Sequence, residues 1–312
     1  MTSSPLQDEH TASSLLPDSD WNVLIVGSSE IAEIESEATR VESILNRLGH
    51  RTSRRIAPRT DWEERIHPAK EDRYDLVVVL GGDGSILRTA HWMGYAQSPV
   101  LGINLGRLGF LAGVSSNDVD TALANLARGR FCCVDHLMLE CEIIRQGHVL
   151  QKVLGLNEAS ILAGPPFSMI EIALHIDGEL ATTYHADGLI VSTPVGSTAH
   201  NLSAGGPIVR KDLDAFIFTP LSPHTLSNRP VIDSATREYE LVFPSPNSGS
   251  ACVVDGRMIS NLVPDDRVRV RRASPRFTLI EMQELAYYRT LREKLFWGGK
   301  TRVAGPQGEQ ET

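Results

Sequence analysis

The sequence predicts an α/β domain with a parallel sheet, followed by a second domain of mostly antiparallel β-structure. Two observations support this prediction. In the first third of the chain, short and uniformly apolar runs alternate with segments of helical periodicity, a pattern typical of parallel strands covered on both faces. Beyond a helix-like stretch at 117–127, apolar residues recur at every second position, which indicates antiparallel strands.

The elements of the first domain follow one another as strand, helix, strand. Residues 21–27 (WNVLIVG) are an apolar run that predicts the first strand. A helix should follow, because five apolar residues recur there with helical spacing: Ile34, Val41, Ile44, Leu45 and Leu48. Further strands are expected at 51–56, 75–80 and 100–104, so this domain is Rossmann-like in class.

The second domain is predicted from alternation. One alternating run spans 137–143, and another spans 170–176 and ends in Asp177-Gly178, a strong hairpin signal. The same period returns at 239–243 and 268–270, so we expect a sandwich or a closed β-structure. A last helix is expected at 286–297, with Tyr288, Leu291 and Leu295 on one face that must dock on the rest of the chain.

Composition restricts the class of partner. The 312 residues carry a formal net charge of −9, which argues against a nucleic-acid surface, because phosphate backbones are held by clustered Lys and Arg. No apolar run approaches the roughly 18 to 20 residues that cross a bilayer, so we expect a soluble protein without a membrane partner. The start of the chain lacks the features of a secretory signal, and the four cysteines lack CxxC spacing, so free thiols in a reducing cytoplasm are expected.

The strongest chemical signal is the segment Gly81-Gly82-Asp83-Gly84-Ser85, at the junction of an apolar strand and a helical pattern. Glycines there allow a sharp turn whose N–H groups approach an anion, and the helix N-terminus adds partial positive charge, so the turn suits a phosphate. A carboxylate beside phosphate is repulsive unless it binds a metal ion or takes a proton. Asp83 therefore indicates catalysis, although it would also serve as an ordinary cap of the following helix.

The acceptor of the phosphate is left open by this turn alone. GGDGS occurs in several phosphotransferases, including 6-phosphofructokinases, and its variant GGDGT occurs in diacylglycerol-type lipid kinases. Later residues have plain alternatives too: Glu158 and Asp187 as solvated loop acids, and Gly205-Gly206-Pro207 as a turn. His185 and His200 also fit core or surface histidines.

Three further segments resemble the signature blocks of bacterial NAD kinases, in the order of that family. They are Asn104-Leu-Gly-Arg-Leu-Gly-Phe-Leu111, Leu156-Asn157-Glu158, and the 22 residues from Asp187 to Ile208 (DGLIVSTPVGSTAHNLSAGGPI). The resemblance covers roughly residues 21 to 300. It implies an enzyme that transfers the terminal phosphate of ATP, or of polyphosphate, to the 2'-hydroxyl of the adenosine ribose of NAD to make NADP.

The resemblance also implies roles for residues. Asp83 would be the catalytic carboxylate near the 2'-hydroxyl, with Gly84 beside it. Phosphate would be bound by five residues: Gly81, Gly82, Gly84, Ser85 and Arg88. NAD would be bound, besides Asp83 and Gly84, by Asn157, Glu158, His185, Asp187, Thr198, Ala199, His200, Asn201, Leu202 and Ser203. Amide, carboxylate and hydroxyl groups at strand ends are the partners that ribose and base edges require.

Two positions depart from the family's pattern. His200 stands where many members have Tyr, and Arg257 stands after Asp255-Gly256 where many have Gln. Both touch the expected dinucleotide pocket. Because His can still stack and hydrogen-bond, we expect altered affinity rather than lost function.

The resulting expectation divides the chain into parts. A disordered leader spans 1–20, an α/β phosphate-donor and catalytic domain spans 21–115, a β-rich NAD-binding domain spans 116–285, and a disordered tail spans 303–312. Residues 286–302 would pack back on the first domain. Mg²⁺ or another divalent ion is expected with ATP, and the family implies a homodimer or homotetramer. A lipid kinase and a non-catalytic dinucleotide sensor remain as alternatives, although we find no membrane-facing stretch and Asp83 is retained.

Overall fold

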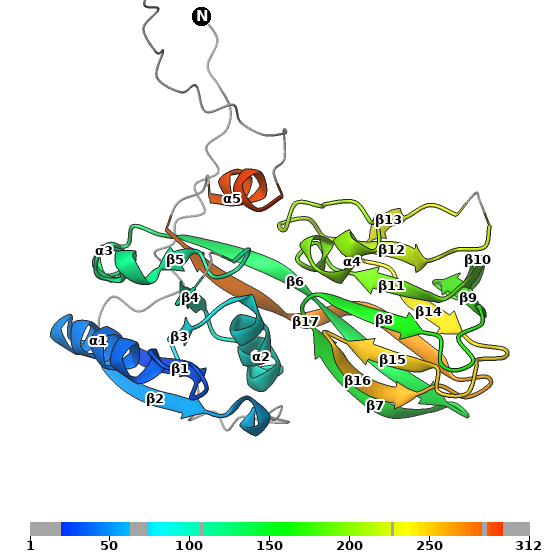
Figure 1. The fold of residues 1–312 in the computed structure, drawn as a ribbon, viewed down its shortest axis with the longest axis horizontal. Coiled ribbons are helices and arrows are strands. Elements are labelled where there is room, and N and C mark those ends of the chain that lie inside the picture. The colour runs from blue at the N-terminus through cyan, green and yellow to red at the C-terminus, as the bar shows by residue number, and fades with distance from the viewer. Residues whose placement is uncertain (1–19, 63–73, 107–108, 226–227, 283–285, 296–312) are drawn as a thin grey trace, which may run out of the picture.

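The computed structural model describes residues 20–62, 74–106, 109–225, 228–282 and 286–295. The expected leader (apart from Asp20) and the expected tail lie outside these residues, as does Trp297. Within the described part, the chain forms two sheets (Figure 1), one mixed and one antiparallel. The predicted fold class is confirmed: a parallel α/β half is followed by a mostly antiparallel half.

The first half is a parallel sheet with helices on both faces. Its strands and helices are β1 (Asn22–Ser28), α1 (Ile34–Arg47), β2 (Arg51–Ala57), β3 (Leu76–Leu80), α2 (Asp83–Met93), β4 (Val100–Asn104), β5 (Val114–Ser115) and α3 (Val119–Leu126). Alternate residues of β1 and β3 point to opposite faces, and both sets are buried. One set packs against α1 and α3, and the other packs against α2. This double burial explains why these strands are apolar throughout.

The strand order β2-β1-β3-β4 reverses direction between β1 and β3. In open parallel sheets, ligands bind outside the carboxyl ends of the strands at such a reversal. β1 ends at Ser28, and β3 ends at Leu80, directly before the Gly81-Gly82 turn. The turn from Gly81 to Ser85 therefore lies at the position that this topology favours for a ligand.

The second half consists of antiparallel strands in two facing sheets. The strands are β6 (Cys132–Arg145), β7 (His148–Gly155), β8 (Glu158–Leu162), β9 (Ile170–Ile176), β10 (Glu179–Ala186), β11 (Gly188–Ser192), β12 (Ala215–Leu221), β13 (Val231–Ser234), β14 (Tyr239–Val242), β15 (Ala251–Val254), β16 (Arg257–Asn261) and β17 (Arg267–Glu281). A 3-10 helix η5 (Gly196–Thr198) and the short α4 (His200–Ser203) follow β11. The Asp177-Gly178 hairpin is present, with φ of +50° and +85°.

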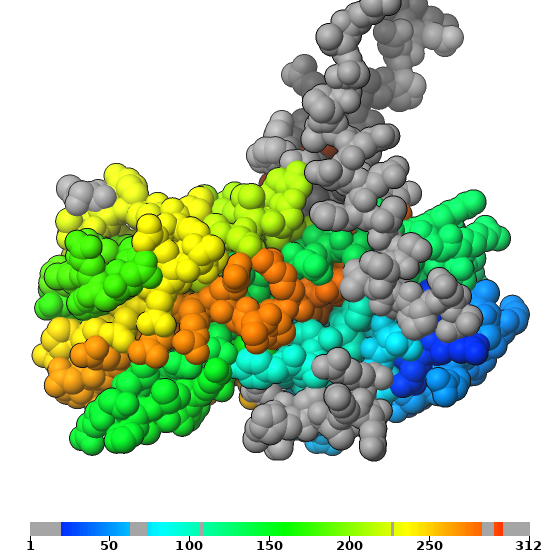
Figure 2. All heavy atoms as spheres, turned by 180° about the vertical axis from the view of Figure 1, so that it is seen from behind, coloured from blue at the N-terminus to red at the C-terminus, as the bar shows by residue number. Residues whose placement is uncertain are grey.

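A single strand joins the two halves. β17 pairs with β6 along most of its length, and near its end Leu279 pairs in parallel with Val100 of β4. Within the described residues, the mixed sheet therefore has 11 strands and runs through the whole molecule. Figure 2 shows β17 (orange) across the middle of one face, between the cyan residues of the first half and the yellow and green residues of the second.

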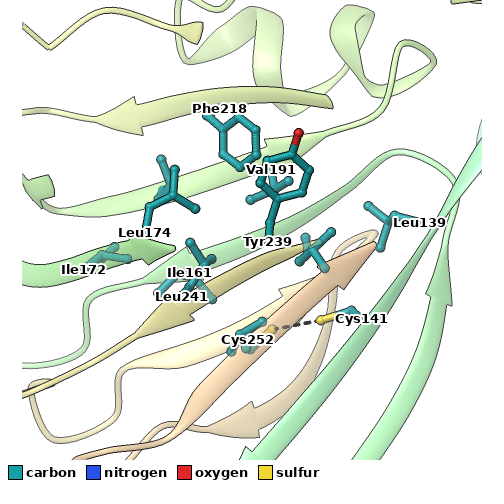
Figure 3. Packing of buried hydrophobic residues seen from close by; sticks show 14 of the residues in the cluster. Leu139, Cys141, Ile161, Ile172, Leu174, Val191, Phe218, Tyr239, Leu241 and Cys252 are labelled. Carbon is teal, nitrogen blue, oxygen red and sulfur yellow. Dashed lines mark hydrogen bonds between the residues drawn. The ribbon is translucent and has the colours of Figure 1, made fainter. Parts of the chain in front are cut away.

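The core of the second half lies between the two sheets. Figure 3 shows that Tyr239 and Phe218 point toward each other from opposite sheets, and their ring centroids are 4.7 Å apart. Cys141 of β6 and Cys252 of β15 also meet there as free thiols, with a hydrogen bond of 3.8 Å between their sulfurs (Figure 3). All four cysteines are free, as predicted, but Cys132 and Cys133 are only half-buried.

The last described helix is α5 (Ala286–Leu295), whose Thr290 and Leu291 are buried. Lys294 places its ammonium 5.4 Å from the ring centroid of Phe110. A cavity of about 310 Å³ lies between α5, α3, the segment 109–114 and the end of β17. No helix in the described part of the chain is long and apolar enough to cross a membrane.

Candidate active site

The site begins at the turn between β3 and α2. Gly81 has φ of +136°, and a Cβ at this position would lie 2.4 Å from Ser85 Oγ, so only glycine fits here. Gly84 is exposed in the first turn of α2. The glycines thus bring the N-terminal end of α2, which favours an anion, to the carboxyl edge of the sheet.

Asp83 is the first residue of α2, and its carboxylate is held by the backbone of a distant loop. Oδ2 accepts a hydrogen bond from Phe110 N at 2.7 Å. Oδ1 accepts from Leu111 N at 3.0 Å and from Ala112 N at 3.1 Å. The N-cap residue of α2 is Gly82, which makes no side-chain cap bond. The alternative that Asp83 is an ordinary helix cap is therefore wrong.

The loop that holds Asp83 belongs to the block resembling the family between Asn104 and Leu111. Gly109 is the residue that lets this loop approach, because a Cβ there would lie 1.9 Å from Asp83 Oδ1. Sequence reasoning did not assign a role to Gly109. A signal existed, since this glycine lies inside the block, but no local rule indicates that it faces a residue 26 positions earlier.

A small basic hollow adjoins the turn at the ends of β1 and β3. Gly27, Ser28, Ser85 and Arg88 line it, together with Trp62, Val79 and Thr89. The Arg88 guanidinium donates to Ser85 Oγ at 3.3 Å. Burial, and next the charge of Arg59, lowers the pKa of Arg88. A half-buried cation near a second cation is a favourable place for an anion.

Asn157 and Glu158 form the second part of the site, at the start of β8. The segment that follows β11 fixes their backbone through hydrogen bonds and close packing. Thr193, just after β11, donates its hydroxyl to Leu156 O at 2.5 Å and its N–H to Asn157 O at 2.8 Å. Gly196 packs closely on the same peptide, since a Cβ there would lie 2.2 Å from Asn157 O. The block that starts at Asp187 thus determines the position of Asn157.

Glu158 is a buried carboxyl group whose Oε2 has no hydrogen-bond partner among the described residues. Burial, and second the negative charge of Asp255, raises the pKa of Glu158 to about 8. At neutral pH this side chain is therefore mostly protonated, so it can donate a hydrogen bond. The plain alternative, a solvated loop acid, is wrong for Glu158.

Asp255 is a site residue that sequence reasoning noted only as the neighbour of Arg257. Its carboxylate accepts hydrogen bonds from the N–H groups of Leu156, Asn157 and Glu158. It also contacts His91 of α2, which sequence reasoning did not consider. The Asp255-Gly256 pair is itself a hairpin signal, but its carboxylate acquires this role only through the pairing of β15 with β8.

The three blocks and the GGDGS helix meet in one buried cluster. It contains Ile86 from α2, Leu111 from the loop that holds Asp83, Leu156 beside Asn157, and Val195 beside Gly196. Packing of this kind places the glycine turn, the loop at 109–112 and the start of β8 around a common centre.

The residues from Thr198 to Ser203 do not all face the same way. His200 and Ser203 are exposed, and Thr198, Ala199 and Leu202 are half-buried. Asn201 is fully buried; its Nδ2 donates to Pro207 O, and its Oδ1 accepts from Thr219. The side chain of Asn201 therefore holds the loop together, and a Cβ at Gly206 would lie 2.1 Å from Asn201 Oδ1.

Asp187 and His185 are not brought to Asn157 and Glu158 within one chain. In the ladder between β8 and β11, Ser192 pairs with Glu158 and Gly188 pairs with Leu162. Asp187 therefore lies beyond the opposite end of β11, roughly 17 Å from the level of Glu158 for five strand residues. It is half-exposed there, with Oδ1 4.0 Å from His224 Nε2.

Comparisons with known proteins identify relatives for both halves of the chain. A family model of the ATP-NAD kinase N-terminal domain matches residues 15–131, and a model of the ATP-NAD kinase C-terminal domain matches residues 156–282. An NAD kinase of Rhodopirellula baltica is 54% identical over 226 residues, which are 72% of this chain and 73% of that protein. An NAD kinase of Heliobacterium modesticaldum is 41% identical over 247 residues, covering 77% of this chain and 87% of that protein.

Two solved structures share the fold. A yeast NADH kinase complexed with NADH superposes with a TM-score of 0.80 at 25% identity, covering 92% of this chain and 91% of the other. An NAD kinase from Archaeoglobus fulgidus in complex with ATP gives a TM-score of 0.68 at 26% identity, covering 88% of this chain and 98% of the other.

Proposed function

The chain belongs to the NAD kinase family, whose members transfer the terminal phosphate of ATP to NAD, and from this premise we propose how its residues perform the transfer. The single observation that carries the proposal is the carboxylate of Asp83, fixed by three backbone N–H groups at the carboxyl edge of the parallel sheet. The relatives favour neither a lipid kinase nor a non-catalytic sensor.

Asp83 is the catalytic carboxylate. Three of its four lone-pair positions are occupied by N–H donors, which leaves one position on Oδ2 for the 2'-hydroxyl of the ribose. An ordinary Asp has a pKa of about 3.9, so it is too weak to ionise the alcohol in advance. Asp83 orients the hydroxyl and accepts its proton late, as the bond to phosphorus forms.

The phosphates of ATP lie against the turn and the basic hollow beside it. Gly82 and Gly84 present backbone N–H groups, Ser85 offers its hydroxyl, and Arg88 supplies positive charge. Gly81 contributes the shape of the turn, because its own N–H is bonded to Ile103 O. The alcohol oxygen of NAD forms a bond to the terminal phosphorus, and the bond from that phosphorus to the bridging oxygen breaks, so ADP leaves. The hydroxyl proton passes to Asp83.

Mg²⁺ accompanies ATP. Among the described residues there is no cluster of three or more His, Cys, Asp or Glu side chains suited to a metal ion. Proteins commonly bind Mg²⁺ through one or two carboxylates plus substrate phosphates. Because the last open position of Asp83 is assigned to the hydroxyl, the ion would be held mainly by the donor phosphates, whose charge it would neutralise.

NAD is bound by Asn157, Glu158 and the loop from Thr198 to Ser203. A protonated Glu158 donates a hydrogen bond and avoids the repulsion that an ionised carboxylate would exert on the phosphates of a dinucleotide. Ala199, His200, Leu202 and Ser203 contact the bases with Thr198. Asn201 supports this loop from within, since its side chain is already bonded to Pro207 and Thr219.

His185 and Asp187 complete the site of a second copy of the chain. Asp187 directly precedes β11, at the opposite end from Glu158, and His185 lies two residues earlier in β10. Both are half-exposed and accessible to a neighbouring subunit. Such an arrangement requires the homodimer or homotetramer that the family resemblance suggests.

The domain division at residues 115 and 116, with 286–302 packing on the first domain, is part of the same proposal. The contact of Lys294 with Phe110 supports that packing. We place the enzyme in the cytoplasm, and the free sulfurs of Cys141 and Cys252, only 3.8 Å apart, support a reducing compartment.

The experiment that tests the activity incubates the protein with ATP, Mg²⁺ and NAD and measures NADP. Formation of NADP that depends on all three components is the expected result. Tight NAD binding without NADP would instead identify a sensor, and replacement of ATP by polyphosphate in the same assay identifies the donor.

A further inference from the structure

The turn between β15 and β16 carries a carboxylate that organises the start of β8. Asp255 and Gly256 have φ of +48° and +77°, the backbone of a tight two-residue hairpin. From there, Asp255 Oδ2 accepts from Leu156 N at 2.6 Å, and Oδ1 accepts from Asn157 N and Glu158 N, each at 2.8 Å. The side chain is fully buried. Three charge-assisted bonds thus fix the segment that presents Asn157 and Glu158.

The same carboxylate also reaches the helix that begins at Asp83. His91 Nε2 lies 2.6 Å from Asp255 Oδ2, and the His91 side chain is only 7% exposed. His91 is in the last turn of α2, eight residues after Asp83, so it fixes the far end of that helix. The near end is fixed by the bonds from Asp83 to residues 110–112.

Arg257 determines which nitrogen of His91 carries the proton. Its guanidinium NH1 lies 3.1 Å from His91 Nδ1. Because a guanidinium only donates, Nδ1 must accept, and the neutral ring then carries its proton on Nε2. That proton is the one donated to Asp255. At position 257, where the resemblance predicts Gln, this chain thus has a side chain bonded to His91.

We propose that Asp255 is a positioning residue of the phosphoryl transfer: through His91 it holds the helix of Asp83 at a fixed orientation to Asn157 and Glu158. His91 is the link, and Arg257 maintains the tautomer that the link needs. The proposal rests on the role of Asp83 given above. Phosphoryl transfer depends on placement of the reacting groups, and a shift of about 1 Å can cost about 100-fold in rate.

Two pairs of variants test the proposal in the full-length enzyme. Asp255→Asn places an amide N–H against backbone donors, and His91→Leu removes the link at similar volume. His91→Gln keeps an N–H donor for Asp255. The matched control is Asp266→Asn, because Asp266 is also fully buried and binds Arg145 and a backbone N–H, that of Val263.

The measurements are kcat, KM for NAD and the melting temperature. We expect Asp255→Asn and His91→Leu to lower kcat by about ten-fold or more. His91→Gln should have a kcat within about three-fold of the parent value. Asp266→Asn should lower the melting temperature but leave kcat within about two-fold of the parent. Unchanged kcat in both Asp255→Asn and His91→Leu would overturn the proposal. If Asp255→Asn does not fold, the His91 pair decides alone.

The outcome is separable from the role of Asp83. Loss of turnover in Asp83→Asn together with normal turnover in His91→Leu would remove the positioning role and leave Asp83 in place. Normal turnover in Asp83→Asn with a low kcat in His91→Leu would remove Asp83 from the chemistry. The contact between His91 and Asp255 would then position some other group of α2.

Discussion

Gly109 and Asp83 lie so close together that a Cβ on residue 109 would be 1.9 Å from Asp83 Oδ1. The absence of a side chain at position 109 is what lets the neighbouring N–H groups reach the carboxylate. The position of the carboxylate is thus determined as much by this glycine as by the helix on which Asp83 lies.

Gly109→Ala should therefore displace Asp83 and lower kcat by about 100-fold, because the methyl group and the carboxylate oxygen cannot occupy the same space. The measurement is steady-state NADP formation. Gly113→Ala is the control, since a Cβ there meets nothing within 4 Å. Equal kcat values for the two variants would show that the close approach does not matter for turnover.

Glu158→Gln should stabilise the protein in a pH-dependent way. The pKa of Glu158 is raised to about 8 from an ordinary value of 4.5, mainly by burial and next by Asp255. Between these values the folded state holds a proton that the unfolded state lacks, so stability falls as pH rises through this window by about 1.4 kcal/mol per unit at most.

The side chain of Gln does not titrate, so Glu158→Gln does not lose folding stability as the pH rises through this window. Chemical denaturation should show Glu158→Gln more stable than the parent by a few kcal/mol at pH 8 and nearly equal to it at pH 4.5. A difference that is the same at both pH values would mean that Glu158 is not a buried titrating group.

Asn201→Leu should cost about 2 to 4 kcal/mol of stability, because it leaves Thr219 Oγ1 and Pro207 O without their partner in a buried place. The comparison is Ser203→Ala in the same loop, where the side chain is exposed and the expected change is within about 0.5 kcal/mol. Urea denaturation measures both. If Asn201→Leu is as stable as the parent, Asn201 does not stabilise the loop, and a direct contact with NAD becomes its expected role.

Mixing two inactive chains tests whether two copies share a site. If His185 and Asp187 serve the neighbouring subunit, Asp83→Asn and Asp187→Ala chains that exchange at random should regain about one quarter of the parent activity, because half of the assemblies are mixed and each has one intact site. The assay is NADP formation after co-refolding. Activity no greater than that of the separate variants would place Asp187 in the site of its own chain.

Local patterns account for much of the first half of the fold. The apolar runs at β1, β3 and β4 and the helical period of α1 are determined by burial on both sides of a parallel sheet, which leaves a direct trace in the sequence. The Asp177-Gly178 turn was predicted for a similar reason, since its backbone needs positive φ at two consecutive residues.

Contacts between residues that are distant in sequence have no local sequence pattern that predicts them. The pairing of β17 with both β6 and β4, which makes one sheet continuous, depends on register over more than 100 residues of sequence. The contact of His91 with Asp255 joins residues 164 positions apart, and neither residue lies in a pattern that predicts the other. Asp83 was found because its motif is local, whereas the groups that fix its position were not.

Asp83→Asn tests the central claim most directly. The amide retains the size of the side chain but cannot accept the proton of the ribose hydroxyl, so NADP formation should be nearly abolished while NAD binding, measured by calorimetry, stays within about three-fold of the parent. Turnover near the parent value in a variant that still binds NAD would contradict the assignment of Asp83 as the catalytic carboxylate.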